Sequence, residues 1–189
     1  MANLILVRHS EPDWGHHAPP SEWVLTERGR HRARLLGEYL RERHVDRIIS
    51  SAEVKAVQTA DIAAKAAGLE HQVSEPKLNE HNRDCEKLLN SNDRRNIIIE
   101  SLRNPRELVY GTETINTALE RFRKGIKRHV DKSSLETVAV VSHGTVISAF
   151  VEDELGIGAV ETWDNFGLPG LIEFEWPNGD TIVDQCAFE

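Results

Sequence analysis

Two histidines follow two short apolar runs in the same way. Residues 4–7 lead into Arg8 and His9, and residues 138–141 lead into His143. Runs of this kind are typical of strands that are buried on both faces. Ligands of open α/β sheets bind beyond the carboxyl ends of the strands, so we expect both imidazoles in one crevice. Two histidines and an arginine at one place predict chemistry on an anion, and a phosphate ester is the leading interpretation.

Each motif also has a plain structural explanation. A neutral imidazole at His9 is a competent nucleophile toward phosphorus, and Arg8 beside it offers a planar fork of donors for two phosphate oxygens. A helix that starts after His143 would aim its free amides at an anion, with Gly144 leaving room for the approach. Lys55, in the first turn of another expected helix, is a possible third cation. Taken singly, each motif is more often a turn, a buried histidine or a solvated lysine.

The elements that must position these residues alternate between strands and helices. Thr26 is a typical N-cap, and Gly68 is a typical helix stop. The sequence near its end predicts a hairpin, so the sheet is expected to be mixed. The expected strands are 4–7, 47–51, 71–75 and 138–141, the hairpin is 172–183, and the expected helices are 26–43, 53–67, 112–130 and 145–155.

A polar, highly charged stretch at about 76–111 separates the third strand from the next helix. We interpret it as a helical cap insertion within a single domain of residues 1–189, and the isoleucines at 97–99 must then be buried. The expected fold is a three-layer α/β/α sandwich with a mixed, mostly parallel sheet.

The bulk properties exclude several classes of protein. A net charge of −8 argues against a general nucleic-acid surface, but a few cations in a cleft can still bind phosphate. No apolar run has the length of a membrane span, and no signal-peptide pattern is present. Cys85 and Cys186 have no metal-ligand spacing and are expected to be reduced thiols. These features predict a cytoplasmic protein with no membrane partner.

Together the motifs resemble the histidine phosphatase superfamily, also called phosphoglycerate-mutase-like, branch 1. The resemblance covers nearly the whole chain and keeps the order and spacing of the family's signatures. The matching segments are Leu6-Val7-Arg8-His9, Leu25-Thr26-Glu27-Arg28-Gly29 with Ala33, Ser50-Ser51 with Ala56-Val57-Gln58-Thr59-Ala60, Leu78-Asn79-Glu80, and Val140-Val141-Ser142-His143-Gly144.

The resemblance implies a role for each matching residue. His9 would attack phosphorus and become phosphohistidine, while Arg8 and His143 hold the transferring oxygens. Glu80 would protonate the leaving oxygen and then activate water. Lys55, Ser10 and Gly144 complete the expected phosphate site, and the resemblance implies neither a metal nor a cofactor.

The chain departs from the family pattern at several positions. Ser10 replaces a glycine and could donate a hydroxyl to phosphate, and Lys55 replaces an arginine and so loses the bidentate fork. Gly15 stands where many members have an asparagine. His81 follows Glu80 where a glycine and a tryptophan are common, and His81 is an alternative acid.

Other clusters carry weaker hypotheses. Asp13, His16 and His17 are a possible metal site without tetrahedral spacing. Basic residues of the cap are a possible attraction for anionic substrates, although a solvated helix face explains them equally well. They are Arg83, Lys87, Arg94 and Arg95, and the four tryptophans are expected to pack rather than to stack on bases.

The leading functional prediction is a metal-independent phosphomonoester hydrolase that works through phosphohistidine at His9. A catalytically weak module that binds a phosphorylated ligand or phosphoprotein is the alternative. A phosphoglycerate mutase is disfavoured, because a mutase must shield its phosphoryl group and the chain is compact. The substrate, either a small phosphorylated molecule or a phosphoprotein, and the oligomeric state stay open.

Overall fold

The computed structural model describes residues 2–14, 18–83, 91–131, 135–177 and 181–182. Within them lie six strands: β1 Ala2–Arg8, β2 Arg47–Ser51, β3 His71–Glu75, β4 Thr137–Ser142, β5 Gly170–Trp176 and β6 Thr181–Ile182. They form one sheet in the order β3-β2-β4-β1-β5-β6. The pairs among β1 to β4 are parallel, whereas β5 pairs antiparallel with β1 and with β6. The predicted mixed sheet with its terminal hairpin is confirmed.

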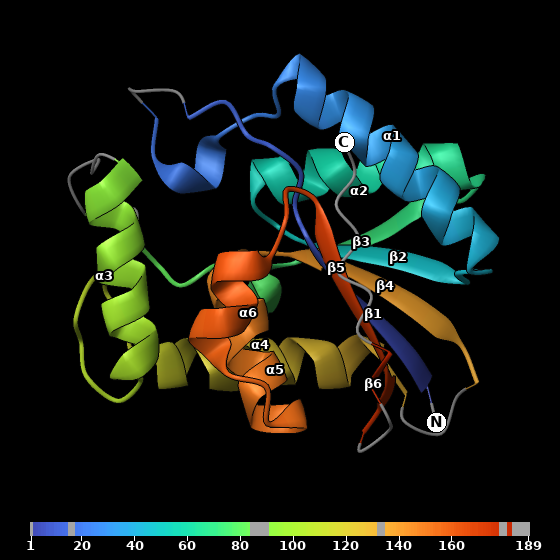
Figure 1. The fold of residues 1–189 in the computed structure, drawn as a ribbon. Helices are drawn as coiled ribbons and strands as arrows, with labels where there is room; N and C mark the ends of the chain where they lie inside the picture. The colour runs from blue at the N-terminus through green and yellow to red at the C-terminus, as the bar shows by residue number, and fades with distance from the viewer. Residues whose placement is uncertain (1, 15–17, 84–90, 132–134, 178–180, 183–189) are drawn as a thin grey trace.

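The helices cover both faces of this sheet. They are α1 Glu27–Glu42, α2 Val54–Ala67, α3 Ser91–Arg103, α4 Ile115–His129, α5 Gly144–Leu155 and α6 Ala159–Asn165, with two 3-10 turns, η1 Pro20–Glu22 and η2 Pro76–Leu78. Helices α1 and α2 lie on one face, and α4 and α5 lie on the other (Figure 1). The fold is therefore the expected three-layer α/β/α sandwich.

The alternation of side chains along β1 explains why both faces need helices. Leu4 and Leu6 pack into the core beneath α4 and α5. Ile5 and Val7 pack into the core beneath α1 and α2. All four side chains are fully buried. A strand that is apolar on both faces is stable only between two layers, so the run in β1 specifies a central position in the sheet.

The helix ends follow the expected signals with one correction. The Thr26 hydroxyl accepts a hydrogen bond from the amide of Gly29 and caps α1. Gly68 adopts a left-handed conformation, φ 77°, and ends α2. Helix α2 begins at Val54 with Glu53 as its N-cap residue, one residue later than the expected start at 53. Ser51 still belongs to β2, and this leaves its side chain free for the site described below.

The insertion contains α3, which packs away from the central sheet. Ile98 and Leu102 contact Ala149 of α5 and Ala159 of α6 in a separate apolar cluster. Ile99 is also buried, whereas Ile97 is only partly buried, so the expectation is confirmed for two of the three isoleucines. Helix α6 was not predicted, since its seven residues span only two turns and carry little periodicity. The role of residues 76–111 as a cap stays a prediction.

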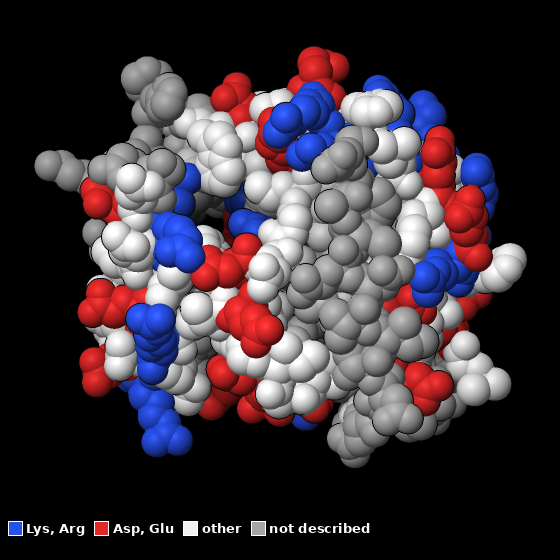
Figure 2. Space-filling model, in the orientation of Figure 1, with Lys and Arg blue, Asp and Glu red and all other residues white. Residues whose placement is uncertain are grey.

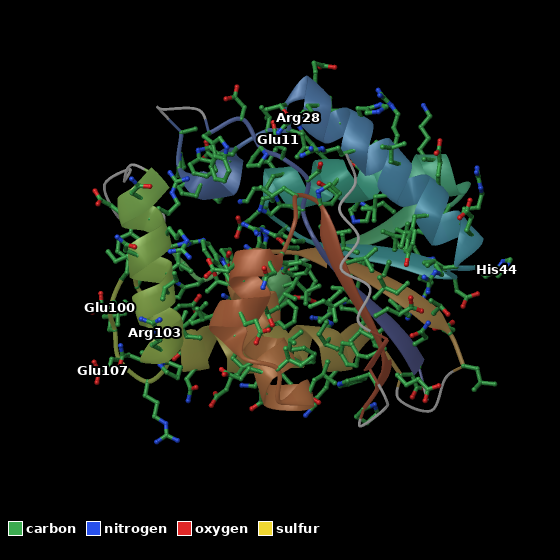
Figure 3. All side chains as sticks on the ribbon, in the orientation of Figure 1. Glu11, Arg28, His44, Glu100, Arg103 and Glu107 are labelled. Carbon is green, nitrogen blue, oxygen red and sulfur yellow. The ribbon has the colours of Figure 1, made fainter. Side chains whose placement is uncertain are left out.

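The segment after β1 is fixed to the start of α1. The Glu11 carboxylate accepts hydrogen bonds from Nε and Nη2 of Arg28 at 2.8 and 2.5 Å (Figure 3). The hydrogen bonds from Arg28 hold the pKa of Glu11 below its usual value. This anchor holds the chain that follows His9. Among the described residues, no helix has the length and apolar character needed to cross a membrane.

Candidate active site

The parallel register of three central strands places their carboxyl ends side by side. Arg8 at the end of β1 is level with Ser142 at the end of β4, and Ser50 of β2 is level with Val141. The His9 and His143 rings that follow lie 5.2 Å apart between centroids and are tilted by 60°. The predicted convergence of the two imidazoles is therefore confirmed.

His9 is buried, and its hydrogen bond to the backbone selects one tautomer of the ring. Its Nδ1 lies 2.8 Å from the carbonyl oxygen of Ser10. A carbonyl only accepts hydrogen bonds, so Nδ1 carries the proton and Nε2 of the neutral ring carries a lone pair. Burial, and then the charge of Lys55, lower the pKa of His9 well below its usual value. The ring is consequently neutral near pH 7, as a nitrogen nucleophile must be.

His143 makes its hydrogen bond through the other ring nitrogen, Nε2. Its Nε2 lies 2.6 Å from the Ser51 hydroxyl, which also accepts the amide N–H of Glu53 at 3.1 Å. With Ser51 assigned as the donor to His143 Nε2, the proton of the neutral ring sits on Nδ1. Nδ1 is buried and has no protein partner among the described residues. Burial lowers the pKa of His143 well below its usual value. Under this assignment, His143 keeps one N–H without a partner.

Arg8 is held by α6 and by the residue that follows this helix. Its Nη1 donates to the carbonyl of Phe166 at 2.5 Å, and its guanidinium lies 5.7 Å from the centre of the Trp163 ring. A side chain at Gly144 would come within 3.1 Å of both Arg8 Nε and Trp163 Nε1, so glycine is needed for this approach. Burial lowers the pKa of Arg8 to about 10, which leaves it charged at neutral pH.

Lys55 lies in the same crevice, as the sequence predicted. Its ammonium group is buried and forms an ion pair with Glu53, and it donates to the carbonyl of Pro20 at 2.7 Å. After burial, its charge is the largest influence that lowers the pKa values of His9 and His143. Lys55 therefore adds positive potential where an anion would bind, although Glu53 neutralises part of it.

Glu80 sits at the start of α5. Its carboxylate accepts hydrogen bonds from the amides of Thr145 and Val146 at 3.2 and 3.3 Å, and it pairs with Arg83 at 3.1 Å. These two amides were expected to face a bound anion, and the protein's own carboxylate takes that position instead. Burial raises the pKa of Glu80, but the charge of Arg83 and the hydrogen bond from the His81 amide outweigh it and lower the pKa.

Two residues that were expected to act at the phosphate site form hydrogen bonds with other parts of the protein. The His81 ring, through Nε2, lies 2.6 Å from the carbonyl of Glu113 and so donates to it, which ties the ring to the protein rather than to the crevice. The Ser10 hydroxyl donates to the carbonyl of Gly29 at 2.7 Å, so its proton is not available to a phosphate oxygen. The Ser10 amide donates to Thr59 Oγ1 at 3.0 Å. Ser10 therefore shapes the turn after His9.

Four residues of the site were not given their roles by sequence reasoning. Ser51 and Glu53 contact His143 Nε2, with the Glu53 carboxylate 3.6 Å away. Arg83 had been interpreted only as a basic residue of the cap. Arg121 lies in the helix expected at 112–130, and no role was assigned to it. The second family signature contained a signal for Ser51, but nothing in the pattern distinguishes a partly buried Arg121 from a solvated one.

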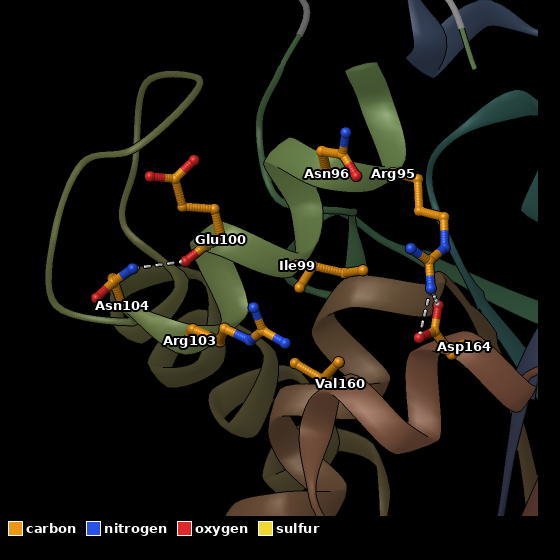
Figure 4. A pocket seen from close by; sticks show the side chains of 8 residues that line it. All are labelled: Arg95, Asn96, Ile99, Glu100, Arg103, Asn104, Val160 and Asp164. Carbon is orange, nitrogen blue, oxygen red and sulfur yellow. Dashed lines mark hydrogen bonds and ion pairs between the residues drawn. The ribbon is translucent and has the colours of Figure 1, made fainter. Parts of the chain in front are cut away.

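The surface of the molecule is hollowed beside α3. Figure 2 shows a depression between α3, α6 and the segment that contains η1, with basic side chains visible inside it. A second hollow of about 550 Å³ lies between α3 and α6 and is lined by Arg95, Glu100, Arg103 and Asp164 among others (Figure 4). Its described lining contains no histidine, and Nη2 of Arg95 donates to both carboxylate oxygens of Asp164 there. We place the reactive centre at the converging ends of β1, β2 and β4.

Several hypotheses from the sequence lie outside the described residues. They concern Gly15, His16, His17, Cys85, Lys87 and Cys186, so the possible metal site with Asp13 stays untested. Within the described ranges, no group of three or more His, Cys, Asp or Glu side chains has a metal-binding arrangement.

Comparison with known proteins identifies the family. The model of the histidine phosphatase superfamily (branch 1) matches residues 4–186, and this chain belongs to that superfamily. It is 31% identical over 170 residues to a probable phosphoglycerate mutase GpmB of Yersinia pestis, a match that covers 84% of this chain and 77% of the relative. The family resemblance expected from the signatures is confirmed.

Solved structures of other proteins have the same fold. Bacillus stearothermophilus YhfR superposes with a TM-score of 0.76 at 21% identity, covering 98% of this chain and 96% of that one. A phosphoserine phosphatase from Entamoeba histolytica, solved with 3-phosphoglyceric acid, superposes with a TM-score of 0.73 at 20% identity and the same coverages. At this identity the likeness establishes the fold.

Proposed function

We propose that this protein is a phosphomonoester hydrolase that forms a phosphohistidine intermediate on His9. The observation that carries the proposal is the convergence of the two buried imidazoles, whose ring centroids lie 5.2 Å apart. His9 presents a lone pair on Nε2, and Nδ1 of His143 has no partner among the described residues. One group suits attack on phosphorus, and the other suits a phosphoryl oxygen, with Arg8 as the adjacent cation.

The proposed reaction has two steps. His9 Nε2 gives its lone pair to phosphorus, and the bond from phosphorus to the ester oxygen breaks. That oxygen leaves with the bonding electrons and takes a proton from Glu80 to become an alcohol. Water then attacks the phosphohistidine and gives a proton to Glu80. The P–N bond breaks, its electrons return to His9, and phosphate is released.

Glu80 must hold a proton for the first step. In the free protein its lowered pKa favours the carboxylate. A phosphate dianion placed beside Glu80 disfavours a second negative charge and raises this pKa, so substrate binding supplies the condition for acid catalysis. Glu80 then donates a proton in the first step and accepts one in the second.

The first experiment measures hydrolysis of p-nitrophenyl phosphate by the wild type and by His9→Ala. We expect turnover that EDTA leaves unchanged and that the substitution abolishes. Quenching the wild type in acid or alkali after mixing with ³²P-labelled phosphate ester should trap label that is stable to alkali and lost in acid, the signature of phosphohistidine. Full activity in His9→Ala would contradict the proposal.

A binding module is the second candidate, favoured by Lys55. This lysine replaces a guanidinium and is partly neutralised by Glu53. Lys55→Arg tests the consequence: turnover rises if the missing fork limits the rate. Stoichiometric phosphate binding without turnover between pH 5 and 8, in the wild type and in Lys55→Arg, would favour the module.

A mutase is the third candidate, because the similar Yersinia protein is named a probable phosphoglycerate mutase. A hydrolase passes the phosphoryl group to water, whereas a mutase returns it to the substrate. Incubation with 3-phosphoglycerate separates the two: we expect release of inorganic phosphate and no 2-phosphoglycerate. The phosphoserine phosphatase neighbour makes phosphorylated metabolites the first substrates to screen.

A further inference from the structure

Arg83 reaches the reactive centre from the loop after Glu80. Its side chain is only 14% exposed, and Nη2 lies 3.1 Å from Glu80 Oε2. The same carboxylate oxygen accepts the amide of Thr145 at 3.2 Å. Arg83 is therefore fixed at the start of α5, directly after His143, and not on an outer face of the cap.

One end of this guanidinium has no assigned partner. Nη1 of Arg83 is buried and makes no hydrogen bond to the protein residues that the structure describes. A buried N–H of a charged group without a partner is costly, so this donor calls for an explanation, and a bound anion supplies one. The charge of Arg83 also contributes to lowering the pKa values of Arg8 and His143, which shows that it lies near both.

We infer that Arg83 binds the phosphoryl group of the substrate and supplies the second guanidinium that position 55 lacks. This inference rests on the proposed function and names a further binding residue for that site. Lys55 offers a point charge that Glu53 shares, whereas a guanidinium donates two parallel hydrogen bonds to phosphoryl oxygens. Arg8 and Arg83 then approach the anion from two different elements.

The inference gives Arg83 a second consequence for Glu80. In the free protein, the Arg83 guanidinium stabilises the Glu80 carboxylate. When a phosphoryl oxygen competes for the guanidinium, part of that stabilisation moves to the substrate and Glu80 gains proton affinity. Substrate binding and the protonation of the acid are thereby coupled through one side chain.

The test compares Arg83→Ala with a matched control, Arg95→Ala, which removes a cation paired with Asp164 in the second hollow. Inorganic phosphate is the probe, and its Kd is measured by titration calorimetry at fixed ionic strength. We expect Arg83→Ala to weaken phosphate binding about 10- to 100-fold, as loss of a buried charged hydrogen bond predicts. Arg95→Ala should change it less than about twofold.

The pH profile separates binding from a purely structural role. In Arg83→Ala, the limb of the kcat/KM profile that Glu80 sets should move to higher pH, and Arg95→Ala should leave it in place. If Arg83→Ala does not fold, Arg83→Lys is measured instead. This variant keeps the charge and loses the fork, and we expect phosphate binding about 5- to 20-fold weaker than in the wild type.

The outcomes distinguish this inference from the proposed function. A wild type that neither binds phosphate nor turns over an ester refutes the proposed function and, with it, the inference. A wild type that does both, while a folded Arg83 variant retains its phosphate Kd, overturns only the role of Arg83. A wild type that binds without turnover refutes the hydrolase, and the Kd of Arg83→Ala still decides the inference.

Discussion

Hydrogen bonds to the backbone and to one serine decide what the two histidines can do. The Ser10 carbonyl fixes the proton of His9 on Nδ1, and the Ser51 hydroxyl fixes that of His143 on Nδ1 by occupying Nε2. Both rings therefore have the same tautomer, but each uses a different nitrogen for its hydrogen bond to the protein. The nitrogen left for a ligand is Nε2 with its lone pair in His9 and Nδ1 with its proton in His143. Complementary roles arise from orientation, although the residue type is the same.

Ser51→Ala tests this assignment. Removing the hydroxyl leaves His143 Nε2 without its donor, so we expect the Nδ1–H tautomer to lose its preference. The kcat for p-nitrophenyl phosphate should fall about tenfold, the effect of one net hydrogen bond. ¹⁵N NMR of the histidine rings reports the tautomer directly.

The matched control is Ser50→Ala. Ser50 is the preceding residue and equally buried, and its hydroxyl donates to the Ser51 carbonyl rather than to a histidine. We expect a similar change in stability and no change in the tautomer of His143. An unchanged His143 tautomer in Ser51→Ala would remove the basis of the assignment.

The buried histidines also predict how stability depends on pH. The folded-state pKa values of His9 and His143 are depressed, so between those values and about 6.5 the unfolded chain binds more protons than the folded one. Stability is therefore full above about pH 6.5 and falls as the pH is lowered through this window. Each histidine contributes a slope of up to about 1.4 kcal/mol per pH unit.

Urea unfolding at pH 7.0, 6.0 and 5.5 measures this slope. His143→Gln should flatten it relative to the wild type, because one of the two groups no longer titrates. His31→Gln, on the exposed face of α1, should leave the slope unchanged. A free energy of unfolding that stays constant from pH 7.0 to 5.5 in the wild type would show that the rings are charged or exposed in the folded protein.

At the scale of elements, the loop that carries Glu80 is held from several directions. Arg121 of α4 donates to the carbonyls of Lys77, Asn79 and Glu80 at 2.9, 2.9 and 3.0 Å. From the sheet, the Ser142 hydroxyl donates to the Leu78 carbonyl at 2.7 Å. These contacts join the acid to the strand that carries His143. Glu80 is therefore placed by tertiary contacts more than by its own loop.

Arg121→Met should lower kcat about 10- to 100-fold, because the loop loses charged hydrogen bonds and Glu80 loses its position. The control is Arg123→Met. Arg123 lies two residues along the same helix, has the same 25% side-chain exposure, and pairs with Asp153 and Glu154 of α5. We expect the control to retain kcat. Equal activity of the two variants would mean that Arg121 is only structural.

The elements also show what the sequence could predict. The ends of these two strands could be predicted from the sequence, because an apolar run followed at once by His9 or His143 is a local pattern. The cap at Thr26 and the stop at Gly68 were local signals as well. The roles of Glu53 and Arg83 could not be predicted in this way, since burial of a charged residue depends on which segments the fold brings together. Without the family signatures, Glu80 is one acid among many.

At the scale of the whole molecule, α3 is attached to the rest of the fold at three places. Its apolar face packs on α5 and α6, and Arg95 pairs with Asp164 of α6. The Arg94 guanidinium lies 5.0 Å from the ring centres of both Trp14 and Trp23. The last contact joins α3 to the segment between β1 and α1, and both border the depression in Figure 2. The two sides of that depression are thus mechanically linked.

Arg94→Ala tests this link by hydrogen exchange. Each cation–π contact is worth roughly 0.5–2 kcal/mol, so we expect amides of α3 to exchange about 2- to 30-fold faster while β1 and β4 keep their protection. Arg103→Ala, in the last turn of the same helix and away from the tryptophans, should leave α3 unchanged. Because the depression is bordered by α3, KM for p-nitrophenyl phosphate should change more than kcat in Arg94→Ala. Uniformly faster exchange in α3, β1 and β4 would instead assign Arg94 to global stability.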